Sequence, residues 1–271
     1  MTTADGDRRD GGDPALQALR AERERWVRSP RGPLALVNSQ TVTVPQPVWP
    51  VPGTWAPAIG GLSVTATADA GVVVDDVLVD GTVHVAGDDA VVASTVRFAD
   101  GTSGSVAATT AGHALRVWDP ASPAIARFGH IGVFPVSTAW VRTGVWEPGD
   151  REGRGSVTDA AGAPLPVAGT LRIRIGVEDR ALVVVRAGDR LQLVFQDATS
   201  GERSYSMGRF LFLDDPGAAG PITVDFNRAV LPPCAFSYQY ACPVPPPENR
   251  LPVPVEAGET HGYDADGAVL H

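Results

Sequence analysis

The residues best suited to chemistry lie in the last third of the chain, and a first group surrounds the turn QDATSGE. Asp197 opens this turn, and Tyr205 and Arg209 follow it. Tyr205 and Arg209 are four residues apart and would face the same side of a strand, which predicts a shared pocket wall. Asp197 can either contact a ligand or organise the turn by accepting hydrogen bonds from backbone donors. The turn also holds Thr199, Ser200 and Gly201.

A second group consists of Asp225, Asn227 and Arg228 in the segment DFNR. In an extended segment Asp225 and Asn227 lie on one face, so a carboxylate and an amide converge, while Arg228 points the other way. Together they could form the floor of a site for a polar or anionic ligand. The alternative is structural, with Asp225 paired to Arg209 or Arg250 so that the C-terminal segment is anchored.

A third group lies in the proline-rich stretch that follows, which holds both cysteines of the chain, Cys234 and Cys242. A catalytic thiol needs a histidine or another cation to lower its pKa, and the internal candidates are His113 and His130. The alternatives are packed thiols and a local disulfide. The spacing of the cysteines fits neither a C-x-x-C redox motif nor a zinc ribbon, so we expect no metal and no cofactor. The polar members of the group are Glu248, Asn249 and Arg250.

A fourth group is aromatic and surrounds the irregular connection in the middle of the chain. Such a cluster predicts either core packing or a cleft between two β-layers, with Arg116 and Asp119 as its polar rim. Its members are Trp118, Phe128, Phe134, Trp140 and Trp146.

The composition narrows the classes of function. A net charge of −9 argues against a nucleic-acid partner, which would need a basic surface to neutralise phosphates. All 22 cationic residues are arginine, which excludes Schiff-base or lysine general-base chemistry. The N-terminal stretch lacks the apolar region of a secretory signal, and no stretch is long and apolar enough for a membrane span. We therefore expect a cytoplasmic protein without a membrane partner; the sequence does not indicate its oligomeric state.

The elements that must position these groups are mostly strands. Proline at a first-turn position and apolar residues at helical spacing predict one amphipathic helix over residues 14–28, which Ser29-Pro30 ends. A Pro/Trp-rich passage from Leu34 to Trp55 is predicted to wrap over the body in an extended form. Beyond Gly60 the apolar period becomes two, and Asp-Gly pairs indicate hairpin turns. The predicted strands cover residues 62–67, 72–79, 82–86, 90–98, 105–109, 114–118, 140–147, 169–177, 180–187, 190–195, 203–213 and 222–225.

This pattern predicts an all-β fold, an antiparallel β-sandwich or partly open barrel built of two meanders. One N-terminal amphipathic helix precedes it, and an extended proline-rich segment follows it. Residues 1–13 are predicted to be a disordered tail, residues 14–259 a single domain, and residues 260–271 a flexible tail. A subdivision of the domain near residues 119–139 is the alternative.

The second half resembles a bacterial and archaeal family known as domain of unknown function 1684 (DUF1684). The resemblance is carried by FQDATSGERSYSMGRFLFL at residues 195–213 and by the proline-rich segment at residues 225–259, with HALRVWDP and IARFGHIGVFPVSTAW as earlier landmarks. It implies a shared all-β fold and a shared surface, and it supplies no activity. One departure is visible, because Leu231 stands where the family pattern implies an asparagine before PPC.

These observations favour a cytoplasmic protein that binds a small polar or anionic ligand. Arg209, Arg228 and Arg250 would recognise the ligand, and Asp225 and Asn227 would orient it. One alternative is a hydrolase or isomerase in which Asp197 or Asp225 is the general base and Tyr205 or Arg209 stabilises charge. Another is a structural module whose C-terminal segment only seals a sheet edge. The binding hypothesis predicts a polar cavity bounded by Arg209, Asp225 and Glu248.

Overall fold

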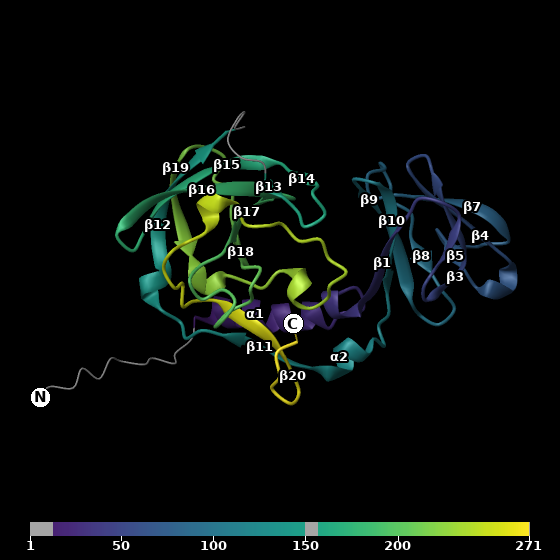
Figure 1. Cartoon of the computed structure of the whole chain (residues 1–271), viewed down its shortest axis with the longest axis horizontal. Helices are drawn as coiled ribbons and strands as arrows, with labels where there is room; N and C mark the ends of the chain where they lie inside the picture. The colour runs from purple at the N-terminus through teal and green to yellow at the C-terminus, as the bar shows by residue number, and fades with distance from the viewer. Residues whose placement is uncertain (1–12, 150–156, 271) are drawn as a thin grey trace, which may run out of the picture.

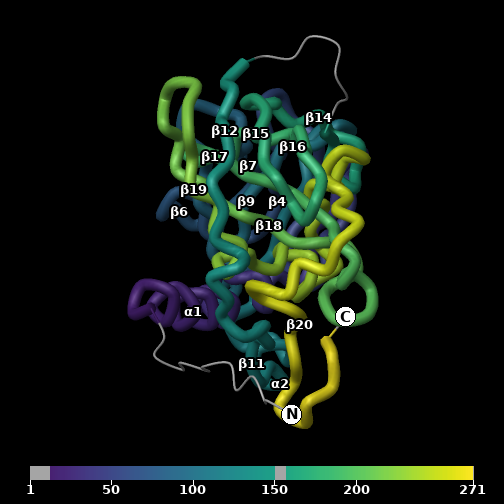
Figure 2. Tube along the Cα trace, turned by 90° about the vertical axis from the view of Figure 1, so that its left-hand side faces the viewer, coloured from purple at the N-terminus to yellow at the C-terminus, as the bar shows by residue number. Residues whose placement is uncertain are grey.

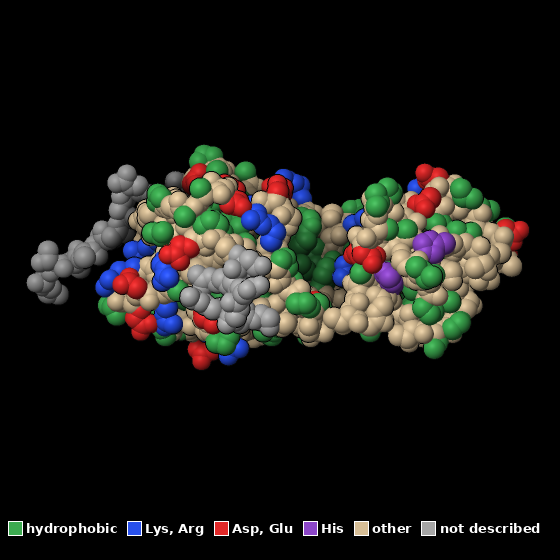
Figure 3. All heavy atoms as spheres, turned by 90° about the horizontal axis from the view of Figure 1, so that it is seen from above, with side chains coloured by type: hydrophobic (Ala, Val, Ile, Leu, Met, Phe, Trp, Pro, Cys, Tyr) green, Lys and Arg blue, Asp and Glu red, His purple; other side chains and the backbone are tan. Residues whose placement is uncertain are grey.

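The computed structural model describes residues 13–149 and 157–270, and these form two lobes joined side by side (Figure 1). We call residues 36–118 the N-terminal lobe and residues 13–35 with 119–270 the C-terminal lobe. Seen from above, the molecule is hollowed between the lobes, and hydrophobic side chains line that hollow (Figure 3). The tail predicted for residues 1–13 lies outside the described residues except for Asp13.

The predicted N-terminal helix is confirmed as α1 (Pro14–Val27). The Asp13 carboxylate caps it by accepting from the backbone N–H of Ala15 at 2.9 Å, and proline occupies the first turn, where no donor is needed. Leu16 and Val27 are its buried residues, so the helix lays one face on the C-terminal lobe. A second, short helix, α2 (Pro123–Arg127), follows the connection between the lobes.

The N-terminal lobe consists of two sheets around one core. The first sheet has the order β1 (Leu36–Val42), β10 (Gly112–Trp118), β9 (Ser103–Thr109), β8 (Val96–Arg97), β5 (Val73–Val74) and β6 (Val77–Leu78). The second has the order β2 (Gln46–Val48), β3 (Val51–Ala58), β4 (Gly61–Ala66) and β7 (Gly81–Ala86). Alternate residues of both sheets point inward, and Trp55, Leu62 and Leu115 are fully buried between them.

Three predictions for this lobe are wrong in detail. The strand predicted over residues 72–79 is a hairpin of β5 and β6. The Pro/Trp-rich passage does not wrap over the body but forms β1, β2 and β3. Pro52 lies where the register of β2 and β3 shifts, and Pro57 lies beyond the last residue paired to β2, so neither removes a ladder donor that β2 needs. The strand predicted over residues 90–98 shrinks to β8. The stretch before β8 forms a turn instead, in which the Asp75 carboxylate accepts hydrogen bonds from the Ser94 hydroxyl and the Thr95 backbone N–H, at 2.8 Å each.

The C-terminal lobe is built on one antiparallel sheet of six strands. Its order is β18 (Arg209–Leu213), β17 (Arg190–Phe195), β16 (Glu178–Ala187), β15 (Val167–Ile175), β12 (Val141–Pro148) and β19 (Gly220–Asp225). Leu182 and Val184 of β16 point into one hydrophobic core, while Val183 and Val185 point into another on the opposite face. The central strands are therefore buried on both sides and read in the sequence as nearly continuous apolar runs.

Two short pairs complete this lobe: β11 (Phe128–Val133) with β20 (Glu259–Asp264), and β13 (Val157–Thr158) with β14 (Pro164–Leu165). Figure 2 shows β11 and β20 side by side below the body of the lobe. Within the tail predicted to be flexible, residues 260–264 belong to β20, which pairs with β11, and Tyr263 stacks on His130 at 5.1 Å between ring centroids. Short 3-10 helices lie at Pro33–Ala35 (η1), Ala68–Ala70 (η2), Thr138–Trp140 (η3), Phe226–Arg228 (η4), Pro233–Ala235 (η5) and Pro247–Asn249 (η6).

The strand predicted over residues 203–213 begins only at Arg209, because the preceding residues form a compact turn. Gly208 enters the strand with a φ of 89°, and a Cβ there would lie 2.2 Å from the carbonyl oxygen of Phe195. The all-β class with one N-terminal amphipathic helix and an extended proline-rich segment is confirmed. The division into one domain or two stays a prediction, although the described residues bury separate cores in the two lobes.

Separate cores make a testable prediction about cooperativity. We expect Leu62→Ala, which cuts the N-terminal core, to cost that lobe about 2–5 kcal/mol of unfolding free energy. Amide hydrogen exchange should then accelerate in β3, β4 and β10 and stay slow in β15–β17. The matched control, Leu193→Ala in the C-terminal core, should give the reverse pattern. Equal acceleration in both lobes for either variant would show that the lobes unfold as one unit.

Candidate functional site

The proline-rich segment lies along the end of β17, in the extended form that its prolines predict. The backbone of Gln196 donates to the carbonyl of Asn249 at 3.1 Å and accepts from the N–H of Leu251 at 2.8 Å. Ala198 donates to the carbonyl of Val253 at 3.2 Å. The segment therefore pairs in parallel with the backbone that leaves β17. Its Leu251 and Val255 cover the core that contains Leu182 and Val184, which we call the inner core.

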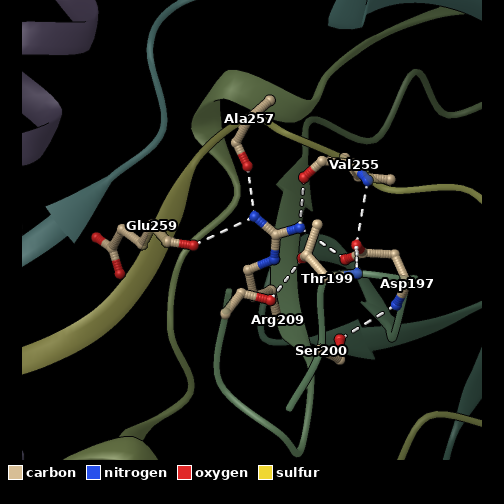
Figure 4. Close-up of polar contacts among 8 residues, drawn as sticks. Asp197, Thr199, Ser200, Arg209, Val255, Ala257 and Glu259 are labelled. Carbon is tan, nitrogen blue, oxygen red and sulfur yellow. Dashed lines mark hydrogen bonds and ion pairs between the residues drawn. The ribbon is translucent and has the colours of Figure 1, made fainter. Parts of the chain in front are cut away.

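Asp197 and Arg209 form an ion pair beneath this segment (Figure 4). One guanidinium nitrogen donates to the Asp197 carboxylate at 2.6 Å and to the carbonyl of Val255 at 2.8 Å. The other donates to the carbonyls of Ala257 and Glu259. The second carboxylate oxygen accepts from the backbone N–H groups of Thr199 and Val255, at 2.8 and 3.1 Å. A single pair thus joins the turn after β17, the start of β18 and the C-terminal segment.

The pair is sealed from solvent. Both side chains are 0% exposed, and the guanidinium lies near the rings of Phe134 and Phe195. Burial lowers the pKa of Arg209, while Asp197 and Glu259 oppose this shift by favouring the charged form. The predicted pocket wall of Tyr205 and Arg209 is not formed, because Arg209 has no surface to offer a ligand. The Tyr205 hydroxyl instead donates to the carbonyl of Cys234 at 3.1 Å.

Asp225 and Asn227 converge, as their spacing predicts, but on each other. Asp225 caps η4 by accepting from the backbone N–H of Asn227 at 3.0 Å and from its side-chain amide at 2.8 Å. Asn227 also bonds both backbone groups of Ser137, at 2.9 Å each, and so fixes the segment that precedes β12. The alternative pairing of Asp225 with Arg209 is wrong, since Arg209 binds Asp197. Arg228 is exposed on the opposite side.

The side chain of Asn249 is buried and bonds to the backbone at the ends of β16 and β17. Its side chain accepts from the N–H of Val183 and donates to the carbonyls of Val183 and Val194, all at 2.8 Å. These bonds lie beyond Val184 and Leu193, the last residue pair of β16 and β17 toward this end. The amide therefore supplies the partners that the separating strands lose. Glu248 and Arg250 on either side are exposed, whereas Arg209 is enclosed with Asp197 and Asp225 is bonded to Asn227, so over the described residues these side chains do not bound the predicted polar cavity.

The two cysteines are buried free thiols. They lie in the core of the C-terminal lobe that contains Val183 and Val185, which we call the outer core. The Cys234 N–H donates to the sulfur of Cys242 at 3.2 Å. A hydrogen bond from the Cys242 thiol lowers the pKa of Cys234, whereas the same interaction and burial raise the pKa of Cys242. Burial also raises the pKa of Tyr205 above its usual range.

The sequence gives little sign of a further buried pair, Arg23 with Glu259. Arg23 of α1 donates to both carboxylate oxygens, at 3.0 and 3.2 Å, and to the carbonyl of Leu231 at 2.8 Å. The N–H of Leu231 donates to the same carboxylate at 2.6 Å. The available signal is an arginine at a position of α1 where the helical spacing calls for an apolar residue. At Leu231, where the family pattern implies asparagine, the backbone makes these bonds and the side chain is buried.

The aromatic group is not one cluster. Trp146 lies in the inner core of the C-terminal lobe with Trp140 against it, and Phe128 lies in the outer core. Phe134 covers Arg209, and Trp118 packs at the junction of the lobes. These residues therefore do not bound the predicted cleft, because they pack in different parts of the molecule.

A hollow that the sequence analysis missed lies on the outer face of β12, β15, β16 and β19 and encloses about 410 Å³. Arg172 and Arg174 extend from β15 onto this face, because they are two residues apart in a strand. Arg172 pairs with Glu147 at 2.7 Å, and Arg174 contacts Asp179 at 3.6 Å. The other lining residues are Thr143, Gly144, Val145, Ile173, Arg180, Ala181 and Pro221. The sequence signal for this face is the alternation of apolar residues and arginines in LRIRI, residues 171–175.

Fold and contacts together define an all-β protein whose C-terminal segment is bonded internally. Residues 126–260 match the model of the family described as "Protein of unknown function (DUF1684)". The match begins after the N-terminal lobe, so the landmark HALRVWDP lies outside it. A search of the curated proteins finds no match.

Among solved structures, the chain is similar to an uncharacterized protein of Haloarcula marismortui determined by solution NMR. The identity is 29%, the alignment covers 49% of this chain and 77% of that chain, and the TM-score is 0.42. In the described part of this chain, no helix is long and apolar enough to cross a membrane. Over the same residues, no three His, Cys, Asp or Glu side chains gather as a metal-binding group.

We expect Asp197→Ala to lower the free energy of unfolding by about 3–5 kcal/mol, because it leaves the buried Arg209 charge without a partner. Chemical denaturation followed by circular dichroism measures this loss. The control is Glu256→Ala, which removes the exposed partner of Arg203 and should cost at most about 1 kcal/mol. Similar losses for the two variants would contradict a structural role for the buried pair.

A second expected outcome concerns the amide of Asn249. Asn249→Ala should cost about 1–3 kcal/mol, because buried backbone groups of Val183 and Val194 lose their partners. The Val183 amide should also exchange with solvent faster. Glu248→Ala, one residue away and exposed, should leave both quantities unchanged. Unchanged exchange at Val183 in the Asn249 variant would show that its backbone bonds do not depend on this side chain.

Proposed function

We propose that the protein binds a small polar anion in the cytoplasm, and that the ligand occupies the arginine-lined hollow on the outer face of the C-terminal sheet. The observation that carries this proposal is the hollow of about 410 Å³ with Arg172, Arg174 and Arg180 in its lining. Each of these arginines also contacts one carboxylate, that of Glu147, Asp179 or Glu178. Ligand sites of soluble proteins start at about 300 Å³. The free thiols support a reducing compartment.

Arg174 is the residue best placed to meet the ligand. Its side chain is 64% exposed, and its contact with Asp179, whose side chain is 82% exposed, is long, at 3.6 Å. Exposed ion pairs of this kind contribute little to stability, so a carboxylate or phosphate can replace Asp179 at small cost. The planar guanidinium can then bind two oxygens of the anion at once. Thr143 adds a hydroxyl to the same lining.

This proposal moves the anion site away from the C-terminal segment. The two terminal nitrogens of Arg209 and the side-chain amide of Asn227 are bonded within the chain, which supports a structural role for both residues. Arg228 and Arg250 are exposed, but they do not line the hollow. The enzyme alternative has less support, because Asp197 uses both oxygens on Arg209 and backbone donors, and Asp225 is committed to Asn227. The structural alternative explains the segment and leaves the hollow unexplained.

The test is titration of ¹⁵N-labelled protein with inorganic phosphate and with succinate, followed by NMR. We expect saturable shifts at the backbone amides of residues 143–145 and 172–181, and their loss in Arg174→Gln. The control is Arg97→Gln in the N-terminal lobe, an exposed strand arginine that also contacts a carboxylate. Native mass spectrometry of freshly purified protein checks for a co-purifying anion. Absence of saturable shifts with both anions and of a bound molecule would refute the proposal.

A further inference from the structure

We propose that Cys234 and Cys242 are a redox-active dithiol, in which Cys234 attacks hydrogen peroxide and Cys242 then closes an intramolecular disulfide. This site is separate from the proposed anion site, because it lies in the core of the C-terminal lobe on the side that carries η5. It is also independent of that proposal.

The first support is the placement of the two sulfurs. Cys234 lies in η5, and its own backbone N–H donates to the sulfur of Cys242 at 3.2 Å. Residue 242 is therefore held against residue 234 although both thiols are free. Phe236 of the intervening loop is buried in the same core cluster and helps to fix the loop. This contact brings the Cys242 sulfur to the backbone of Cys234, and such proximity is what closure of a disulfide requires.

The second support is the difference between the two thiols. A hydrogen bond from the Cys242 thiol lowers the pKa of Cys234, and the nearby Tyr205 hydroxyl acts in the same direction. Cys242 receives the opposite influence, because Cys234, burial and Asp159 all raise its pKa. Cys234 is thus the better thiolate and nucleophile, and Cys242 stays protonated until it is needed. Tyr205 is fixed in this position by its bond to the carbonyl of Cys234 at 3.1 Å.

The chemistry balances with peroxide as the oxidant. The Cys234 thiolate attacks one peroxide oxygen, the O–O bond breaks, and the leaving hydroxide takes a proton to become water. Cys234 is then a sulfenic acid. The Cys242 sulfur attacks the Cys234 sulfur, and the sulfenic hydroxyl leaves as a second water with the proton of the Cys242 thiol. Two thiols are oxidised and one peroxide is reduced to two waters. The residues are 9% and 7% exposed, which favours a small oxidant over a bulky disulfide.

The loop that the disulfide would close also contacts the N-terminal lobe. The Ser237 hydroxyl donates to the carbonyl of Leu36 at 3.0 Å, and the Gln239 side chain accepts from the N–H of Ser39 at 3.0 Å. Tyr240 packs against the cluster that contains Trp118 at the junction of the lobes. Oxidation would therefore restrain the loop of residues 234–242, which contacts both lobes.

The test uses the reduced full-length protein and a small molar excess of hydrogen peroxide. We expect the intact mass to fall by two hydrogen atoms and both thiols to resist alkylation after denaturation, with dithiothreitol restoring them. The assignment is unambiguous because the chain has only two cysteines. Protein unfolded in urea is the control and should form the disulfide several-fold more slowly. Alkylatable thiols after peroxide, or equal rates in folded and unfolded protein, would overturn the proposal.

Single variants test the order of the two steps. Cys242→Ser should accumulate a sulfenic acid at Cys234 that dimedone captures, and Cys234→Ser should give little adduct at Cys242. Tyr205→Phe should slow the capture several-fold, while Tyr263→Phe, a tyrosine outside this core cluster, should not. Melting curves confirm that each variant is folded. Preferential capture at Cys242 would reverse the assigned roles and contradict the proposal.

Discussion

The ion pair of Asp197 with Arg209 is the interaction on which the C-terminal lobe depends most. A buried guanidinium must satisfy its donors, and the carbonyls of Val255, Ala257 and Glu259 can do so only if the proline-rich segment lies where it does. Asp197 in turn holds the N–H of Val255 and the turn before β18. The ion pair therefore fixes the path of the proline-rich segment and also contributes to the stability of the C-terminal lobe.

The same arrangement continues along the segment. Asn249 satisfies the strands where β16 and β17 separate, and Glu259 binds Arg23 of α1. Gly258, between these contacts, has a φ of 78° and leaves no room for a Cβ against the carbonyl of Ala229. The charged and amide side chains that make this part of the sequence distinctive thus hold the first helix, the sheet and the C-terminal segment together. The anion site and the dithiol that we propose lie elsewhere, at the arginines of β15 and at the two thiols.

Sequence periodicity was sufficient for the helix at Pro14 and for β15, β16 and β17, because each has a local apolar pattern and a turn signal beside it. It failed for β1–β3, where prolines argue against strands and only the pairing register shows that they are tolerated. It also failed for the site. Asp197 and Arg209 are twelve residues apart, but their partners in the C-terminal segment lie 46 to 58 residues away. The partners of Asn249 lie 55 and 66 residues away, and Glu259 lies 236 residues from Arg23. Local spacing carries no information about such contacts.

Asp197 and Arg209 stabilise the fold through each other. A double-mutant cycle measures this coupling directly, with Asp197→Asn, Arg209→Met and the double variant compared by chemical denaturation. We expect a coupling energy of about 1–3 kcal/mol, with the double variant losing less stability than the sum of the single variants. A coupling energy below about 0.5 kcal/mol, with the two losses simply additive, would contradict it.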